Sequence, residues 1–181
     1  MRNIKVGCIF LFSLCIASCS GMKIDDFKDN KPEFKLEQYF EGPSKGYGVV
    51  YDWRGNVTRQ FVVDLMGTWD GKVLVLDEDF LFSDGEKQKR VWSIEKIGEN
   101  NYQGTAGDVI GIAKGKRSGN ALNWGYTLRV PVDETTYDLV FDDWMFLQTE
   151  KILLNRAYMK KWGFVVGEVH LFFLKEDTAN D

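Results

Sequence analysis

The sequence predicts an all-β protein, an antiparallel up-and-down β-barrel of about ten strands. Apolar and polar residues alternate with a period of two, most regularly over 121–130, where Leu122, Trp124 and Tyr126 oppose Asn123 and Gly125. Turn sequences rich in Gly, Asn and Asp separate such runs at intervals of about 10–15 residues. Glycines also lie inside the runs, where they are costly in a flat sheet but are expected where a barrel wall bends.

Each expected strand is an alternating or apolar run between two turn signals. The expected strands span 33–41, 46–53, 57–66, 72–82, 87–97, 102–113, 121–130, 136–147, 150–160 and 164–174. The segment 150–161 also consists of residues that favour a helix, so one short helix near 150–161 is the alternative there. Closure of such strands removes exposed sheet edges and leaves room inside for one small ligand. Charges on both faces of the strands argue against a barrel that spans a membrane.

The N-terminus has the three parts of a secretory signal. Arg2 and Lys5 precede the apolar run 6–15, which is too short to span a bilayer. Ile16-Ala17-Ser18-Cys19 then reads as a lipobox, so we expect a lipoprotein signal peptide over 1–18 and lipid attachment at Cys19. Several acyl chains, palmitate among them, would hold the protein stably on a membrane. The alternative is an ordinary cleaved signal peptide with an incidental cysteine.

The residues after the lipobox predict the location and the domain organisation. Ser20, rather than Asp, follows Cys19, which favours the inner leaflet of the outer membrane, facing the periplasm. We expect an acylated cysteine and flexible tether over 19–31, a β-barrel domain over 32–175 and a disordered tail over 176–181. Cys8 and Cys15 would leave with the signal, so the mature chain would keep no thiol for a disulfide, a metal or a nucleophile.

The charge of the mature chain limits its partners. After loss of the signal, 21 basic and 27 acidic residues remain, a net charge of −6. Such a surface does not suit nucleic acid, nor electrostatic docking of the whole protein on anionic lipid, so the anchor is expected to hold the membrane covalently. The expected partners are the membrane, through the N-terminal acyl chains, and a lipid or other apolar small molecule. The sequence does not identify a protein partner.

A candidate ligand site is expected around Asp142-Asp143-Trp144. Neighbouring residues of a strand point to opposite faces, so one of the two Asp side chains is expected inside the barrel with a polar partner. The candidate polar cluster comprises Asp143, Arg156, Tyr158, Glu168 and His170, and the candidate aromatic lining comprises Trp124, Tyr126, Phe141 and Phe172. The alternative is that Glu168 and His170 face solvent, or that the group is a structural salt-bridge network.

The chain offers few groups for catalysis or metal binding. It has one histidine, no thiol in the expected mature part and no G-x-S-x-G motif, so no catalytic residue, metal site or cofactor is predicted. Acid–base chemistry by carboxyl groups and tyrosines is left open.

Several motifs resemble an uncharacterised family of proteobacterial lipoproteins known as domain of unknown function 3833. The matching stretches are Pro32-Glu33-Phe34 to Phe40-Glu41-Gly42, Gly67-Thr68-Trp69-Asp70-Gly71, Phe82-Ser83-Asp84-Gly85, Asn123-Trp124-Gly125-Tyr126, Phe141-Asp142-Asp143-Trp144 and Gly163 to Phe173. The resemblance implies a lipoprotein and carries over no catalytic or binding residues. Gly67-Thr68-Trp69 also echoes the Gly-x-Trp of lipocalins and the related calycin barrels, although their motif lies on the first strand.

Three hypotheses for the function follow. The first is an anchored barrel that binds a lipid or other small apolar ligand inside. The second is a non-catalytic structural or interaction lipoprotein of the cell envelope, whose barrel is filled by its own aromatic side chains. The third is a lipid-modifying enzyme. A cavity of several hundred cubic ångströms inside the barrel would favour the first or the third hypothesis over the second. Polar groups that converge in that cavity with perturbed pKa values would favour the third, and a solid core with an exposed apolar patch would favour the second.

Overall fold

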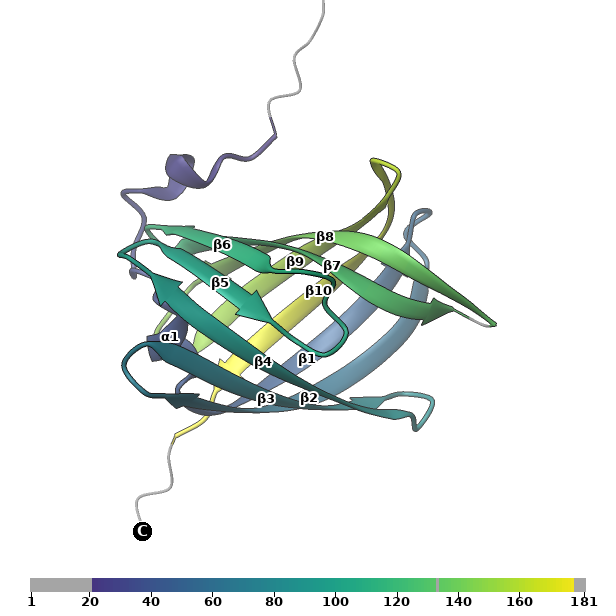
Figure 1. The fold of residues 1–181 in the computed structure, drawn as a ribbon, viewed down its shortest axis with the longest axis horizontal. Coiled ribbons are helices and arrows are strands. Elements are labelled where there is room, and N and C mark those ends of the chain that lie inside the picture. Colours follow the sequence, from purple (N-terminus) through teal and green to yellow (C-terminus); the bar gives the residue numbers. More distant parts are fainter. Residues whose placement is uncertain (1–20, 133, 178–181) are drawn as a thin grey trace, which may run out of the picture.

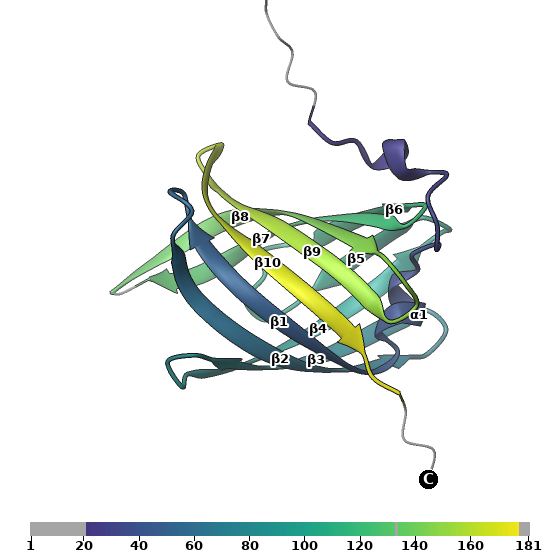
Figure 2. The same ribbon diagram turned by 180° about the vertical axis from the view of Figure 1, so that it is seen from behind.

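The computed structural model describes residues 21–132 and 134–177, in which ten antiparallel strands close into one barrel (Figures 1 and 2). The strands are β1 (Gly42–Asp52), β2 (Val57–Trp69), β3 (Val73–Phe82), β4 (Lys87–Ile97), β5 (Asn101–Thr105), β6 (Ala113–Ser118), β7 (Ala121–Val132), β8 (Thr135–Leu147), β9 (Ile152–Lys161) and β10 (Phe164–Lys175). The expected signal peptide, Cys19 and residues 178–181 of the expected tail lie outside the described residues. Within the described part of the chain, no helix is long and apolar enough to cross a membrane.

The topology is up-and-down, as the sequence predicts. Every strand pairs with its neighbours in the chain, and β1 pairs with β10 to close the barrel, from Ser44 opposite Lys175 to Asp52 opposite Gly167. This closure leaves neither terminal strand as a free edge, which removes a template for aggregation.

One end of the barrel, which we call the helix end, is covered by helix α1 (Leu36–Phe40) (Figures 1 and 2). Glu37 on α1 is buried, and it accepts hydrogen bonds from Lys96 Nζ at 2.5 Å and from the Tyr102 hydroxyl at 2.8 Å. Lys175 Nζ donates to the backbone carbonyl oxygens of Gln38, Tyr39 and Glu41, at 2.7–3.1 Å. These bonds satisfy the last carbonyl groups of a helix too short to be stable alone.

The other end, which we call the open end, carries the β1–β2, β3–β4, β7–β8 and β9–β10 hairpin tips (Figure 1). The first helical element, the 3₁₀ helix η1 (Ile24–Phe27), lies outside the barrel. Its Phe27 ring contacts the rings of Trp144 and Phe146 on β8, with centroids 6.0 and 5.3 Å apart. This contact fixes the side of the barrel from which the chain enters.

The helix half of the interior is filled by side chains. Six large side chains there are almost completely buried: Tyr102, Phe34, Leu74, Leu122, Leu153 and Val63. Inward-facing glycines make room for aromatic rings, because a Cβ atom on Gly48 would overlap the Phe61 ring and one on Gly115 would overlap the Trp124 ring. These glycines therefore sit at close approaches, as their positions within strands predict.

Two of the expected strands are wrong, and the errors offset each other in the count. The segment 33–41 contains α1, because Leu36, Tyr39 and Phe40 share one buried helical face at i, i+3 and i+4. In the segment 102–113, β5 ends at Thr105, residues 106–112 form a loop, and β6 begins only at Ala113. The short helix considered near 150–161 is strand β9, so barrel pairing overrides the helix propensity of that segment.

The division of 102–113 leaves a seam in the barrel wall, which we define as residues 87–92 of β4 facing 126–132 of β7. β4 pairs with β5 only from Ser93 to Ile97, and β6 pairs with β7 only up to Gly125. The loop 106–112 fills the seam. It follows the β7 edge through Ile110 N–H donating to Thr127 O and Arg129 N–H donating to Asp108 O, at 2.8 and 2.9 Å.

Candidate functional site

A cluster of polar side chains lies inside the barrel, and we call it the buried polar cluster. Its members come from five strands and the seam loop: Glu78, Arg90, Asp108, Tyr126, Asp143 and Asn155. On β3 and β4, Glu78 and Arg90 fall in phase with the apolar residues that face inward, such as Leu76 and Trp92. Strand alternation thus directs these charges into the interior.

Arg90 holds the first half of the cluster together. Its Nε lies 3.0 Å from both carboxylate oxygens of Asp108, and its Nη2 lies 2.7 Å from one of them. Its Nη1 lies 3.6 Å from Glu78 Oε2, which is too long for a hydrogen bond, and this buried oxygen has no hydrogen-bond partner. The guanidinium also lies over the ring of Phe80, 5.4 Å from its centroid. The Glu78 carboxyl therefore keeps an unused acceptor inside the barrel.

Asp143 holds the second half together. It accepts a hydrogen bond from the Tyr126 hydroxyl at 3.1 Å and another from Asn155 Nδ2. The same Asn155 amide donates to the backbone carbonyl of Trp144 at 3.2 Å. Polar groups on three neighbouring strands thus satisfy one another's hydrogen bonds, and Asp143 and Asn155 are buried.

Burial raises the pKa of two of the carboxyl groups and so makes them weaker acids than they are in water. It raises the pKa of Glu78 to about 7, a shift that Arg90 opposes and that the charges of Asp108 and Asp143 reinforce. Burial likewise raises the pKa of Asp143 to about 7, although its hydrogen bonds from Asn155 and Tyr126 oppose the shift. Two acids in one interior that titrate near neutrality are typical of functional sites. In the described part of the chain, no group of three His, Cys, Asp or Glu side chains is arranged to hold a metal ion.

Aromatic rings form the wall beside the cluster. The Trp92 ring meets the Trp124 and Tyr126 rings edge to face, with centroids 5.8 and 5.5 Å apart, and Tyr126 stacks on Phe141 at 5.0 Å. Trp92 is on β4 and Tyr126 is on β7, so this contact crosses the seam. Trp124, Tyr126 and Phe141, expected in the lining, all face inward.

Towards the open end, the interior is lined by apolar side chains that are only partly buried. They are Val50, Phe80, Phe82, Met159, Val169 and Leu171. Partial burial of inward-facing residues means that solvent reaches the inner wall from this end. The open half of the barrel therefore presents accessible apolar surface above the buried polar cluster.

The structure does not bring the other candidate residues to Asp143. On β9, Asn155 and Ala157 are buried, so their neighbours Arg156 and Tyr158 point outward. On the outer wall, Arg156 Nε donates a hydrogen bond to Glu168 Oε2 at 2.9 Å. His170 Nε2 lies 2.9 Å from the same oxygen. Phe172 also lies on the outside, against Tyr47. This arrangement is the solvent-facing salt-bridge network considered as the alternative.

Sequence reasoning missed Glu78, Arg90, Asp108 and Asn155. A signal for two of them is present, because Glu78 continues the inward phase of Leu74 and Leu76, and Arg90 continues that of Trp92. Asp108 has no such signal, since it belongs to a loop whose path depends on where β5 and β6 end.

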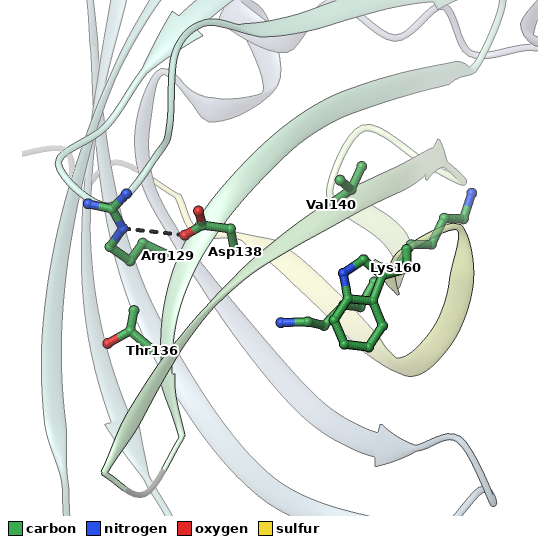
Figure 3. Close-up of a pocket in the computed structure, with 7 residues that line it drawn as sticks. Arg129, Thr136, Asp138, Val140 and Lys160 are labelled. Atoms are coloured by element: carbon green, nitrogen blue, oxygen red, sulfur yellow. Dashed lines mark hydrogen bonds and ion pairs between the residues drawn. The ribbon is translucent and has the colours of Figure 1, made fainter.

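One hollow on the outer surface lies beside the β7–β8 and β9–β10 hairpins (Figure 3). It has a volume of about 550 Å³, and its lining includes Arg129, Asp138, Lys160, Lys161 and Trp162. Figure 3 shows Arg129 turned towards Asp138, and their Nε and Oδ1 atoms lie 3.3 Å apart. Because it is open and lies outside the barrel, this hollow is separate from the buried polar cluster.

Comparison with known proteins supports the fold and gives a family. The structure is similar to that of the S-type phycobiliprotein lyase CPES from Guillardia theta, with a TM-score of 0.55 and 7% sequence identity, over 78% of this chain and 90% of that one. At this identity, the likeness shows a shared β-barrel fold and nothing of the function. The search of curated proteins found no match. A family model described as a protein of unknown function, DUF3833, matches residues 13–175, and the chain therefore belongs to the DUF3833 family.

Proposed function

We propose that the protein is a lipid-anchored protein of the bacterial outer membrane that binds an amphipathic lipid or another small apolar molecule in its barrel. The observation that carries this proposal is the arrangement of the interior. Partly buried apolar side chains line the open half, and Glu78, with an unused acceptor, lies below them among buried polar groups. An apolar body and a polar end would each find a matching surface there.

The charges of the buried polar cluster favour an uncharged or cationic polar end. The cluster contains three carboxyl groups and one guanidinium, and Arg90 is already held between Asp108 and Glu78. No cation of the cluster is left to pair with an anionic ligand, whereas Glu78 Oε2 can accept a hydrogen bond. A hydroxyl, amide or amine end is therefore expected to bind better than a carboxylate.

The test uses fluorescent probes with the same acyl chain and different ends: a hydroxyl, an amine or a carboxylate. We expect the purified full chain to bind the hydroxyl and amine probes more tightly than the carboxylate probe. In Glu78→Leu, loss of the acceptor is expected to weaken binding of the amine probe by about tenfold or more.

Glu95→Leu is the matched control, because Glu95 lies on the outer face and pairs with Lys72. It should leave all affinities unchanged. Equal affinities in Glu78→Leu and the wild type would contradict the proposed site.

A structural or interaction lipoprotein is the second candidate, and the filled helix half of the interior favours it. Under that alternative, none of the probes enters the barrel, and the buried polar cluster only stabilises the wall. Failure of every probe to bind would favour this candidate.

A further inference from the structure

Two neighbouring hairpin tips at the open end carry exposed aromatic side chains. On the β1–β2 tip, Trp53 is 68% exposed, and on the β9–β10 tip, Trp162 and Phe164 are 88% and 75% exposed. β1 and β10 are paired strands, and Figures 1 and 2 both show the two tips side by side. Such side chains cost free energy in water, so their gathering at one place indicates a binding surface.

The turn that presents Trp162 is unusual for a bulky residue. Trp162 has a φ of 50° and Gly163 has a φ of 85°. Both values are positive, as in a type I′ hairpin turn, in which Asn, Asp or Gly ordinarily occupies the first position. A bulky residue with a positive φ costs free energy. Burial of the Trp162 side chain within the barrel does not offset this cost, because the side chain lies in solvent.

Each of the two tips also carries a cation next to its tryptophan. The Arg54 guanidinium lies 4.6 Å from the centroid of the Trp53 ring, and Lys161 Nζ lies 5.0 Å from that of Trp162. Among the described residues, neither Arg54 nor Lys161 forms a salt bridge, whereas Lys160 pairs with Asp142 and Arg129 with Asp138. Lys161 Nζ also lies over the ring of Tyr137, 3.8 Å from its centroid. Indole rings beside cations that form no salt bridge in the described part of the chain are suited to the boundary between lipid headgroups and acyl chains.

We propose that these residues, which we call the aromatic rim (Trp53, Arg54, Lys161, Trp162 and Phe164), dock on the surface of a bilayer that contains anionic phospholipid. The aromatic side chains enter the headgroup boundary, and the two cations contact phosphate groups. η1 packs against Trp144 and Phe146 near the helix end of β8, whereas the two tips stand at the open end (Figure 1). The choice of a bilayer as the partner rests on the exposed indole rings and the two cations, and on the proposed lipid anchor, which would keep the protein near a membrane.

Docking at the rim would bring the open end of the barrel to the lipid surface. A lipid could then pass between the bilayer and the partly buried apolar lining without crossing water. The ligand site and the rim are separate parts of the molecule, so each can be removed without the other.

The test is quenching of tryptophan fluorescence by brominated phospholipids. The purified full chain is placed in vesicles of phosphatidylethanolamine and phosphatidylglycerol, a fraction of whose acyl chains carry bromine. We expect strong quenching in the wild type, and loss of most of it in the double variant Trp53→Ser, Trp162→Ser. Trp69→Ser is the matched control, because Trp69 is a partly buried tryptophan at the helix end, and it should leave the quenching unchanged.

Three further measurements separate this inference from other accounts. Arg54→Gln with Lys161→Gln should reduce the quenching in vesicles with phosphatidylglycerol, and should have little effect in vesicles of phosphatidylcholine alone. Equal fractional quenching in the wild type and the double tryptophan variant would overturn the inference. Protection of the rim by a second copy of the chain, seen as dimers in sedimentation, would overturn it as well. Binding of the acyl probes by the double variant, measured in detergent, reports on the proposed ligand site independently of the rim.

Discussion

Arg90 and Asp108 form a bidentate ion pair across the seam, with nitrogen–oxygen distances of 2.7–3.0 Å. The pair joins β4 to the loop that lies along β7, at a point where no strand connects the two. Loss of either partner would leave a partly buried charge without its ion pair. The pair therefore stabilises the barrel wall by holding β4 and the loop 106–112 together across the seam.

Asp108→Asn is expected to loosen the seam. Removal of one partner of an ion pair costs about 3–5 kcal/mol of unfolding free energy when the pair is fully buried and about 1 kcal/mol or less when it is exposed, so a loss between these limits is expected for this partly buried pair. We expect a loss of this size in chemical denaturation, and faster amide hydrogen exchange in the loop 106–112. The control is Asp79→Asn, which breaks an exposed pair with Lys89 and should cost about 1 kcal/mol or less. Similar losses in the two variants would contradict this stabilising role for Asp108.

The buried acid Glu78 should make the fold less stable as the pH rises from about 4 to 7. Its pKa is raised from 4.5 to about 7 in the folded protein. Between these values the folded protein holds a proton that the unfolded chain has released, so the free energy of unfolding falls with pH and levels off above about 7. In Glu78→Gln, the fall between pH 4 and pH 8 should shrink by about 3 kcal/mol. Glu95→Gln, on the outer face, should keep the wild-type profile, and a Glu78→Gln profile parallel to the wild type would disprove the assignment.

Gly48 is expected to tolerate no side chain, because a Cβ atom there would overlap the Phe61 ring. Gly48→Ala should therefore destabilise the protein by about 1–3 kcal/mol, measured by chemical denaturation. Gly125→Ala is the matched control. Gly125 also lies in a strand, but the nearest atom to its Cβ position is Lys114 O at 3.9 Å. We expect no loss there, and equal effects of the two substitutions would contradict the close approach at Gly48.

Lys96 is expected to hold α1 on the helix end. Burial opposes the ionisation of Glu37, but hydrogen bonds from Lys96 and Tyr102 outweigh it, and the pKa of Glu37 lies below its ordinary value. In Lys96→Met, the Glu37 carboxylate loses its charged partner, and we expect a loss of about 3–5 kcal/mol in unfolding free energy. Lys72→Met removes the exposed partner of Glu95 and should have a small effect. A small effect in both variants would show that Glu37 does not depend on Lys96.

Cys19 is expected to carry the acyl chains that anchor the protein. Cells that express the full chain and are fed an alkyne analogue of palmitate should incorporate the label into the wild type and into Cys15→Ser. Label should be absent from Cys19→Ser, because the thiol at the end of the lipobox is the predicted attachment point. Label that persists in Cys19→Ser would refute the predicted attachment site.

Period-two alternation was sufficient to predict the strands of the barrel, because alternate residues of each paired strand face the interior and are apolar. It predicts β4 with its observed limits, and it places Trp124, Tyr126 and Phe141 inside. It fails at 33–41, where α1 buries Leu36 and Tyr39 at helical spacing within a segment that also alternates. A five-residue helix is too short to show a clear helical period, so only its tertiary contacts reveal it.

The candidate site could be predicted only in part, because phase within a strand decides which side chains meet. Asp143 faces inward, and Arg156, chosen as its partner, lies on the opposite face from Asn155, which does bond to it. β9 has apolar residues on both faces, with Leu153 inside and Leu154 outside, so alternation alone does not define its phase. Asp108 depends on a loop path that no local pattern specifies.

The most direct test of a ligand-binding barrel is the mass of the protein as it comes from the cell. We would purify the full chain gently from membranes, record its native mass spectrum and analyse its organic extract. The proposal predicts one amphipathic molecule per chain, in addition to any covalent acyl groups, with an uncharged or cationic polar end, and its loss in Glu78→Leu. A mass that shows no bound molecule, together with failure to take up any of the three acyl probes, would contradict it.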